Sequence, residues 1–218
     1  MSLALTRLLQ LASPALPVGA YTYSQGLEWA VEAGTVKDEA TALVWIGDQL
    51  EWNLGRFEAP LLARMMTAWR ATDEVGLAEL DAQYLASRES AELRAESLQM
   101  GHSLRRLIDD LKEILGVSPG RTFAAVWSGL AAAWQIAPAD ALAAWLWSWA
   151  ENQTMAALKT VPLGQAAGQR ILLDIGGRIP AVVERALQLD EEQFSNFAPG
   201  FAIACARHET QYSRLFRS

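Results

Sequence analysis

The chain has 218 residues and a formal net charge of −7, and 51% of its residues are hydrophobic against 20% charged, which excludes an intrinsically disordered chain. It contains 38 alanines and 31 leucines but only 28 valines, isoleucines and threonines together. Since Ala and Leu favour helices whereas β-branched residues favour strands, this composition excludes a β-sandwich or a β-barrel. An acidic chain without a clustered Lys/Arg face is also a poor partner for nucleic acid.

Residues 1–13 are expected to form an amphipathic first helix. They resemble a signal peptide only superficially, because Arg7 lies where the apolar region would begin. A longer apolar region, 122–150, carries Pro138 and Asp140 near its middle, and a central Asp opposes membrane insertion by about 2.5–3.5 kcal/mol. We therefore expect two buried helices divided at Pro138, no membrane contact, and a soluble cytoplasmic protein.

The next helices are expected to start at recognisable N-cap patterns. Residues 22–25 have the T-x-x-Q form of a capping box and predict a helix that ends at Gly34. Residues 35–38 repeat an N-cap pattern and predict a second helix, whose apolar stripe continues to about residue 71. Gly55 marks a bend or a stop within it.

Helical patterns account for the rest of the chain. Residues 77–115 are predicted to form one or two helices, which Gly and Pro residues at 116–120 separate from the next helix. Further helices are predicted at about 121–136, 138–160, 163–175, 179–189 and 199–210. No linker, low-complexity tract or internal repeat divides the sequence, so we predict an all-α fold, a single-domain bundle of about nine or ten helices spanning residues 1–218.

The sequence has none of the common catalytic or nucleotide-binding motifs, such as GxxxxGK[ST], GxGxxG, HExxH or GxSxG. Histidine, the usual general base near neutral pH, occurs only at positions 102 and 208. Cys205-x-x-His208 is the one spacing that suggests metal ligands, but two ligands make a site only if a two-fold axis supplies two more. The lone cysteine requires no oxidising compartment. We predict a protein that is not an enzyme and holds no metal or cofactor of its own.

The sequence contains nine tryptophans, most of which are expected to pack in the core. Trp145 and Trp149 share one helical face, whereas Trp147 points elsewhere. One face of this helix must therefore contact something beyond the nearest core layer, and we predict a homodimer interface there.

Two stretches have compositions that a helical core does not require. In residues 13–28, two prolines and a glycine form a stiff connector beside the polar side chains of Tyr21, Tyr23, Ser24 and Glu28. In residues 159–170, Lys159 lies near a helix C-terminus and Gln165 near the next helix start, in a segment with glycines that allow close helix packing.

The third stretch is residues 207–218, called the tail below. Chain ends are normally polar and frayed, but this one carries Tyr212, Leu215 and Phe216 among arginines. Burying Leu215 and Phe216 would contribute about 1.5–3 kcal/mol each. The tail either docks on its own chain or is held by another protein, and its composition, typical of interface cores, leads us to favour a partner.

These three stretches resemble the UreF family of urease accessory proteins. The family patterns are S-x-x-L-P-V-G-x-[FY]-[ST]-Y-S-x-G-L-E, K-x-V-P-L-G-Q-x-x-G-Q-R and H-E-x-x-Y-x-R-L-F-R-S, and the sequence has all three in this order. The resemblance covers nearly the whole chain. Ala20 stands where many members have Gly, and Gln25 stands where His is frequent, which removes a possible metal ligand.

The resemblance implies an all-α, non-catalytic helper that dimerises, binds a UreD (or UreH) accessory protein and recruits the GTPase UreG. It implies that the assembly acts on apo-urease and couples GTP hydrolysis to nickel insertion. By motif, the expected partner-binding residues are Tyr21, Tyr23, Ser24, Glu28, Lys159, Gln165, Arg207, His208, Glu209, Tyr212, Arg214, Leu215, Phe216 and Arg217.

Two other hypotheses are open. The protein could be a GTPase-activating protein in the strict sense, with Arg214 or Arg217 supplied to the nucleotide site of UreG. It could also be a hydrolase or lyase that uses Glu28, Cys205 or His208. The adaptor hypothesis is favoured because common catalytic motifs are missing from the sequence.

Overall fold

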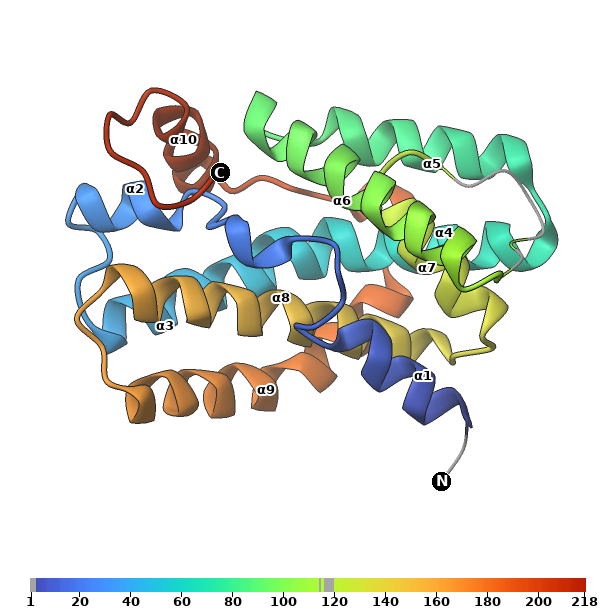
Figure 1. Ribbon diagram of the computed structural model, residues 1–218, viewed down its shortest axis with the longest axis horizontal. Helices are drawn as coiled ribbons and strands as arrows, with labels where there is room; N and C mark the ends of the chain where they lie inside the picture. Colours follow the sequence, from blue (N-terminus) through green and yellow to red (C-terminus); the bar gives the residue numbers. More distant parts are fainter. Residues whose placement is uncertain (1–2, 114, 116–119) are drawn as a thin grey trace.

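The computed structural model describes residues 3–113, 115 and 120–218. Within these ranges the chain is helical and contains no strand, as the composition predicts (Figure 1). The α-helices are α1 (Leu3–Ala12), α2 (Leu27–Glu32), α3 (Glu39–Asp48), α4 (Ala59–Ala71), α5 (Glu74–Ala86), α6 (Ala91–Asp110), α7 (Phe123–Ala133), α8 (Pro138–Thr160), α9 (Gln165–Gln188) and α10 (Pro199–His208). Two short 3₁₀ segments, η1 (Ala20–Thr22) and η3 (Glu191–Gln193), and a π-helical segment, η2 (Gln49–Glu58), complete the described elements.

Helix α8 lies at the centre of the bundle (Figure 1). It packs against α9 along much of its length and also contacts α1, α2, α3 and α4. The fully buried side chains in this region include Leu27, Ile46 and Trp127 on other helices and Leu142 on α8 itself. One cluster of buried residues extends through the sequence from Leu11 to Phe216, so the end of the chain contributes to the same apolar core as its beginning.

The helix predicted to start at a capping box in residues 22–25 starts later, and that prediction is wrong. Thr22 instead ends η1, and the N-cap of α2 is Gly26 with φ 76°. Gln25 has φ 51°, so two successive residues take the left-handed conformation and turn the chain. A helix cannot pass through such a turn.

The predicted helices 163–175 and 179–189 are one continuous helix, α9, with Pro180 inside it. Ile175, Ile179, Val182 and Val183 are all buried along this helix. Burying such side chains contributes about 1.5–3 kcal/mol each, which outweighs the roughly 3 kcal/mol that a proline costs in a helix interior.

Gly55 does not stop the helix that contains it, because α3, η2 and α4 follow one another without a break. A Cβ atom at Gly55 would lie 2.6 Å from Cγ1 of Val182 on α9. The glycine thus allows close packing of α9, which is a reason for its presence other than a bend.

Other predicted boundaries agree with the structure. Asp38 caps α3 by accepting a hydrogen bond from the Thr41 backbone N–H. Residues 77–115 contain two helices, most of α5 and all of α6, and the break predicted at 116–120 lies, apart from Gly120, outside the described residues. No helix in the described part of the chain combines the length and apolarity needed to cross a membrane.

Candidate functional site

The tail folds back over α2, α6 and α8, so that the C-terminal end of the chain lies between α2 and α6 in Figure 1. Two of the sequence stretches with unusual composition, 13–28 and 207–218, therefore meet. Their contact is built mostly from buried polar groups.

Glu28, in the first turn of α2, holds the backbone of the tail. Its Oε1 accepts a hydrogen bond from the Leu215 N–H at 2.7 Å, and its Oε2 accepts one from the Phe216 N–H at 3.0 Å. The side chain is only 7% exposed. Hydrogen bonds to a charged acceptor contribute more than neutral ones, about 1.5–3 kcal/mol each, so Glu28 is a strong anchor for the tail.

His208, the last residue of α10, is fully buried between two carboxylates. Its Nε2 lies 3.4 Å from Oε2 of Glu28, and its Nδ1 lies 2.7 Å from Oε2 of Glu92 on α6. The other oxygen of Glu92 accepts a hydrogen bond from Arg214 of the tail at 2.6 Å. These polar contacts join α2, α6, α10 and the tail.

The last residue of the chain is bound by backbone N–H groups. The Ser218 carbonyl oxygen accepts hydrogen bonds from the N–H groups of Ser24 at 2.6 Å and Gln25 at 2.9 Å, and from the Ser24 hydroxyl. The left-handed turn at Gln25 and Gly26 aims these N–H groups outward. A Cβ on Gly26 would lie 3.1 Å from Sγ of Cys205, so the absence of a side chain at Gly26 also allows α10 to pack closely against this turn.

A second buried carboxylate, Glu96 on α6, lies beneath the Ser218 side chain. Its two oxygens accept hydrogen bonds from Nε2 of Gln25 at 2.7 Å and from the Ser218 hydroxyl at 2.8 Å. Gln25 in turn accepts a hydrogen bond from Nε1 of Trp149 on α8. Burial raises the pKa of Glu96 to about 7, against the opposing effect of these two hydrogen bonds.

The tail presents different side chains inward and outward. Phe216 is 7% exposed, within the main core, and Nζ of Lys159 lies 5.4 Å from the centre of its ring. Tyr212 and Leu215 point away from the protein and are 105% and 73% exposed. The tail is thus attached by its backbone, by Phe216 and by the polar side chains of Arg214 and Ser218, while its other large apolar groups face solvent.

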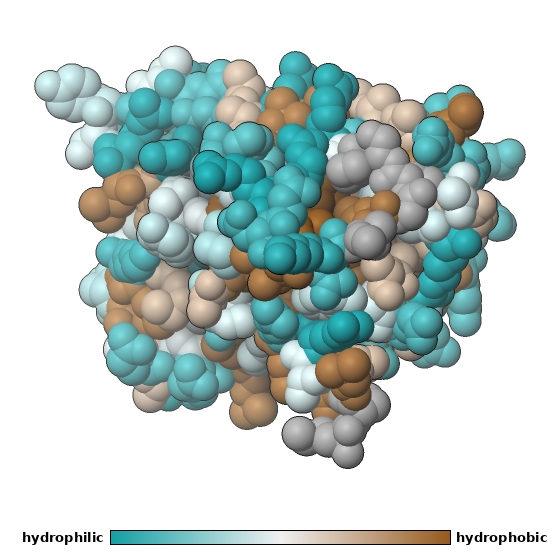
Figure 2. All heavy atoms as spheres, turned by 45° about the vertical axis from the view of Figure 1, so that its right-hand side comes forward, coloured by the Kyte–Doolittle hydropathy of each residue, from teal (hydrophilic) through white to brown (hydrophobic). Residues whose placement is uncertain are grey.

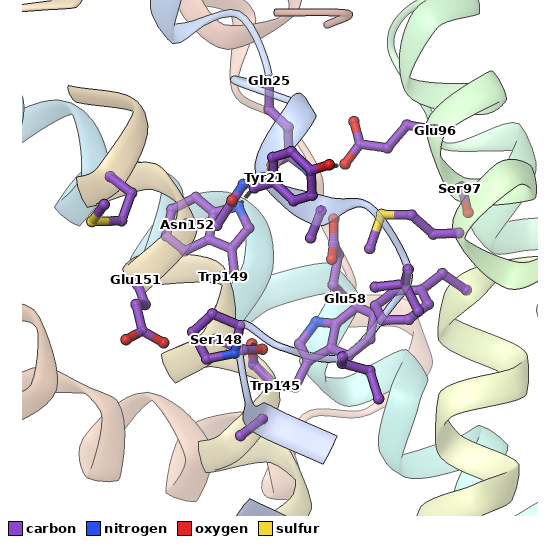
Figure 3. A pocket seen from close by; sticks show the side chains of 18 of the residues that line it. Tyr21, Gln25, Glu58, Glu96, Ser97, Trp145, Ser148, Trp149, Glu151 and Asn152 are labelled. Carbon is purple, nitrogen blue, oxygen red and sulfur yellow. Dashed lines mark hydrogen bonds between the residues drawn. The ribbon is translucent and has the colours of Figure 1, made fainter. Parts of the chain in front are cut away.

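A cavity of about 320 Å³ adjoins the tail site between α6 and α8. Figure 3 shows Glu96 and Ser97 on one side of it, Trp145, Ser148 and Trp149 on the other, and Gln25 at one end. Its walls are mostly apolar. Gln25 and Glu96 both line the cavity. Each also contacts Ser218 of the tail, Gln25 through its backbone N–H and Glu96 through its side chain. The cavity and the tail site are therefore continuous.

Most of the predicted site residues are brought together here, but several lie in the interior. Exposed residues are Tyr21, Lys159, Gln165, Arg207, Glu209, Tyr212, Arg214, Leu215 and Arg217, whereas Tyr23, Ser24, Glu28, His208 and Phe216 are buried. The described contacts of the tail do not include Gln165, which is the first residue of α9. The tail docks on its own chain, the less favoured of our two expectations, so a docked Phe216 is not available to a partner.

Sequence reasoning missed the contribution of α6. Glu92 and Glu96 are one helical turn apart on this helix and both bind the tail. Two acidic residues at i and i+4 occur on many solvent-exposed helices, so their spacing alone gave no reason to single them out. Leu93, Ser97 and Met100 of α6 are also buried, so this face is not exposed, but their burial is visible only in the structure.

The Cys205-x-x-His208 pair is not arranged as a pair of metal ligands. Both ring nitrogens of His208 face carboxylates, and burial raises the pKa of the Cys205 thiol well above its ordinary value. In the part of the chain that the structure describes, no group of three or more His, Cys, Asp or Glu side chains could hold a metal ion.

The surface gives no sign of one large apolar face on the side shown in Figure 2. Hydrophilic residues predominate there, and hydrophobic residues form separate small clusters. Scattered apolar residues of this kind are normal on a folded protein.

Fold and site together define an all-α protein whose C-terminal segment is folded back as an ordered, partly apolar surface. The family model for UreF matches residues 36–176. "Urease accessory protein UreF" of Dechloromonas aromatica (strain RCB) is 60% identical over 99% of this chain and 98% of its own length, and that of Azoarcus sp. (strain BH72) is 60% identical over 99% and 96%. The corresponding protein of Pseudomonas fluorescens (strain SBW25) is 49% identical over 97% of both chains. The chain belongs to the UreF family of urease accessory proteins.

Proposed function

We propose that this protein is a non-catalytic adaptor in urease maturation. In this proposal it bridges a UreD (or UreH) accessory protein and the GTPase UreG on apo-urease, and couples GTP hydrolysis to nickel insertion, nickel being the cargo. The observation that carries the proposal is the docked tail, whose backbone is anchored while Tyr212 and Leu215 stay exposed. A cytoplasmic location is part of the same proposal.

The docked tail has the properties of a preorganised binding surface. A segment that is already ordered loses less conformational entropy when a partner binds. Exposed Tyr, Leu and Arg side chains are available on it, and Tyr and Arg are enriched among the residues that dominate interface energies. Tyr21, 67% exposed on η1, lies on the stretch to which the tail binds and extends this surface.

Lys159 and Gln165 lie on either side of the α8–α9 connection, and both are exposed. We propose that these two residues at the α8–α9 connection contribute to the coupling between this protein and UreG. The strict alternative, in which Arg214 or Arg217 is supplied to the nucleotide, has less support, because Arg214 is bound to Glu92 and Arg217 to Tyr23, and either would have to be released first.

The proposal is tested by light scattering on a sizing column with the full chain and its cognate UreD-like and UreG-like proteins. We expect a complex with the wild-type chain and a dissociation constant at least tenfold higher for the Tyr212→Ala/Leu215→Ala double variant, because interface hot spots contribute about 2 kcal/mol or more. Neither side chain is buried, so the variant should fold normally.

The matched control is Leu173→Ala on α9, outside the tail. Leu173 is 80% exposed, comparable to Leu215 at 73%. This control should leave complex formation unchanged. A complex that forms equally well with the tail double variant would contradict the assignment of the tail as the partner surface. Absence of any complex with the wild-type chain would contradict the adaptor function itself.

A further inference from the structure

We propose that the cavity between α6 and α8 is a binding site for a neutral, largely apolar molecule that carries a carbonyl oxygen. In this proposal the oxygen accepts a hydrogen bond from the indole N–H of Trp145, and the apolar part of the molecule fills the rest of the cavity. The inference does not rest on the adaptor function, because it concerns a site of the isolated chain and is tested there.

The cavity has the size and the access that a small-molecule site needs. Its volume of about 320 Å³ lies within the range of about 300–1,000 Å³ that is typical of such sites. Leu16, Met100 and Phe123 are among the apolar side chains that line it. Tyr21 and Met155 also line it and are 67% and 46% exposed, so the cavity opens to solvent beside them and a ligand can enter.

The first sign of a ligand is the Trp145 side chain in the wall formed by α8. It is 6% exposed, and its Nε1 has no hydrogen-bond partner in the described part of the chain. The ring is held in place by Phe123, stacked on it at 5.2 Å between ring centres, and by the edge-on ring of Trp127 at 5.3 Å. By contrast, Nε1 of Trp149 donates to Oε1 of Gln25. Since an indole N–H can only donate, Trp145 lacks an acceptor.

The second sign is Ser97 in the opposite wall, on α6. It is 5% exposed and its hydroxyl has no hydrogen-bond partner among the described residues. A helical serine commonly bonds to a carbonyl one turn back, as Ser103 and Ser148 do. Nε of Arg88 is a further buried donor without a partner in the lining of this cavity. Unpaired buried donors are rare, so three in one cavity indicate an acceptor that comes from outside.

The charges around the cavity favour a neutral ligand. Glu58 and Glu96 are 8% and 7% exposed, and Figure 3 shows both carboxylates directed into the space between α6 and α8. Glu58 already accepts from Arg88, and Glu96 accepts from two donors. An anion would be repelled by these carboxylates, and a cation would find both already paired. Glu151 and Lys159, which also line the cavity but are less buried, have opposite charges.

The test is an NMR titration of the isolated full-length chain with acetophenone, isopropylbenzene and benzoate. These probes share a benzene ring with a branched substituent of three non-hydrogen atoms, and only acetophenone offers a neutral acceptor. We expect acetophenone to shift the Trp145 indole N–H signal downfield, as hydrogen bonding does, and isopropylbenzene to leave it without such a shift. Benzoate should bind at least tenfold more weakly than acetophenone. The Trp145 signal is identified by its absence in Trp145→Phe.

Trp145→Phe keeps an aromatic ring and removes the donor. It should weaken acetophenone binding at least tenfold, equivalent to about 1.4 kcal/mol, and change isopropylbenzene binding less than threefold. Comparing each probe between proteins removes the difference in hydrophobicity between the two probes. The matched control is Trp134→Phe, since Trp134 is 5% exposed and its Nε1 is also unpartnered among the described residues, but it is not part of the cavity lining. It should leave both constants unchanged.

Ser97→Ala is a second variant that removes a single oxygen atom, for use if Trp145→Phe does not fold. It should weaken acetophenone binding at least threefold and leave isopropylbenzene binding unchanged. The proposal is overturned if acetophenone does not shift the Trp145 signal, if Trp145→Phe weakens both probes equally, or if benzoate binds more tightly than acetophenone. None of these results bears on whether the tail binds a partner, which the light-scattering experiment decides.

Discussion

Glu28 and Phe216 are 188 positions apart in the sequence and are joined by a hydrogen bond from the Phe216 backbone N–H to Oε2 of Glu28, 3.0 Å long. The same carboxylate binds the Leu215 N–H. Because the contact is made to the backbone, it fixes the path of the tail without specifying its side chains. The outward residues of the tail are thus free to bind a partner, as the proposed adaptor function requires.

Replacing Glu28 with Gln should release the tail. The amide retains one acceptor oxygen and loses the charge, so one of the two tail N–H groups loses its charged acceptor. A hydrogen bond to a charged group contributes about 1.5–3 kcal/mol, so protection of the Leu215 and Phe216 amides from exchange should fall at least tenfold at pH 6. Glu32→Gln, an exposed change on the same helix, should have no effect. Equal protection in both variants would show that Glu28 does not hold the tail.

The buried pair of Arg88 and Glu58 should respond strongly when one partner is removed. The two side chains are 6% and 8% exposed, and the Arg88 guanidinium lies 4.3 Å from the centre of the Tyr84 ring. Arg88→Met leaves the Glu58 charge buried and unpaired, which should lower the free energy of unfolding by about 3–5 kcal/mol. Urea denaturation at pH 7 measures this change.

The control for Arg88 is the double variant Arg88→Met/Glu58→Met, in which neither charge remains. Replacing both ions of a buried pair by apolar residues of similar size is often neutral or stabilising. The double variant should therefore be more stable than the single one. If the double variant is the less stable of the two, the pair contributes net stability and the expected penalty for an unpaired charge is wrong.

Local signals in the sequence predicted much of the fold. Where they failed, contacts with residues far away in the sequence overrode the local preference. A helix follows the N-cap pattern at 35–38 as predicted, and its N-cap is Asp38, the last residue of that pattern, which pairs with Thr41. Ser24 and Gln25 do not start a helix, because their N–H groups bind the carbonyl of Ser218, a partner 194 positions from Ser24. Pro180 likewise fails to end α9, because tertiary burial outweighs its local preference.

The candidate site was only partly predictable for the same reason. The stretches 13–28 and 207–218 were singled out by composition, and they do meet. Glu92 and Glu96 were not singled out, since their partners His208 and Ser218 lie 116 and 122 positions away. The pattern of a single sequence indicates which residues are neighbours on one helix. A buried carboxylate can be identified only from the residues, distant in the sequence, that pack against it.

Two helical glycines should respond in opposite ways to substitution by alanine. A Cβ at Gly129 on α7 would lie 2.5 Å from the Trp69 ring, whereas a Cβ at Gly177 on α9 meets nothing within 4 Å. Gly129→Ala should therefore destabilise the protein by about 1–3 kcal/mol through overpacking. Gly177→Ala should stabilise it by about 0.5–1 kcal/mol through helix propensity. Thermal unfolding of both variants measures the difference, and a change of the same sign in both would contradict this packing.

The proposed homodimer is tested at Trp147, which is 36% exposed on α8 and lies against Gly176 of α9. Its neighbours Trp145 and Trp149 are respectively buried and partly buried, so Trp147 is the member of the triplet that can reach another molecule. If it lies in a dimer interface, Trp147→Ala should raise the dimer dissociation constant about thirtyfold, equivalent to about 2 kcal/mol. Analytical ultracentrifugation across a dilution series measures this constant. Trp52→Ala removes a comparably exposed tryptophan, 49% exposed on η2, and should leave the constant unchanged. A wild-type chain that stays monomeric at all concentrations, or an equal effect of both variants, would exclude an interface at Trp147.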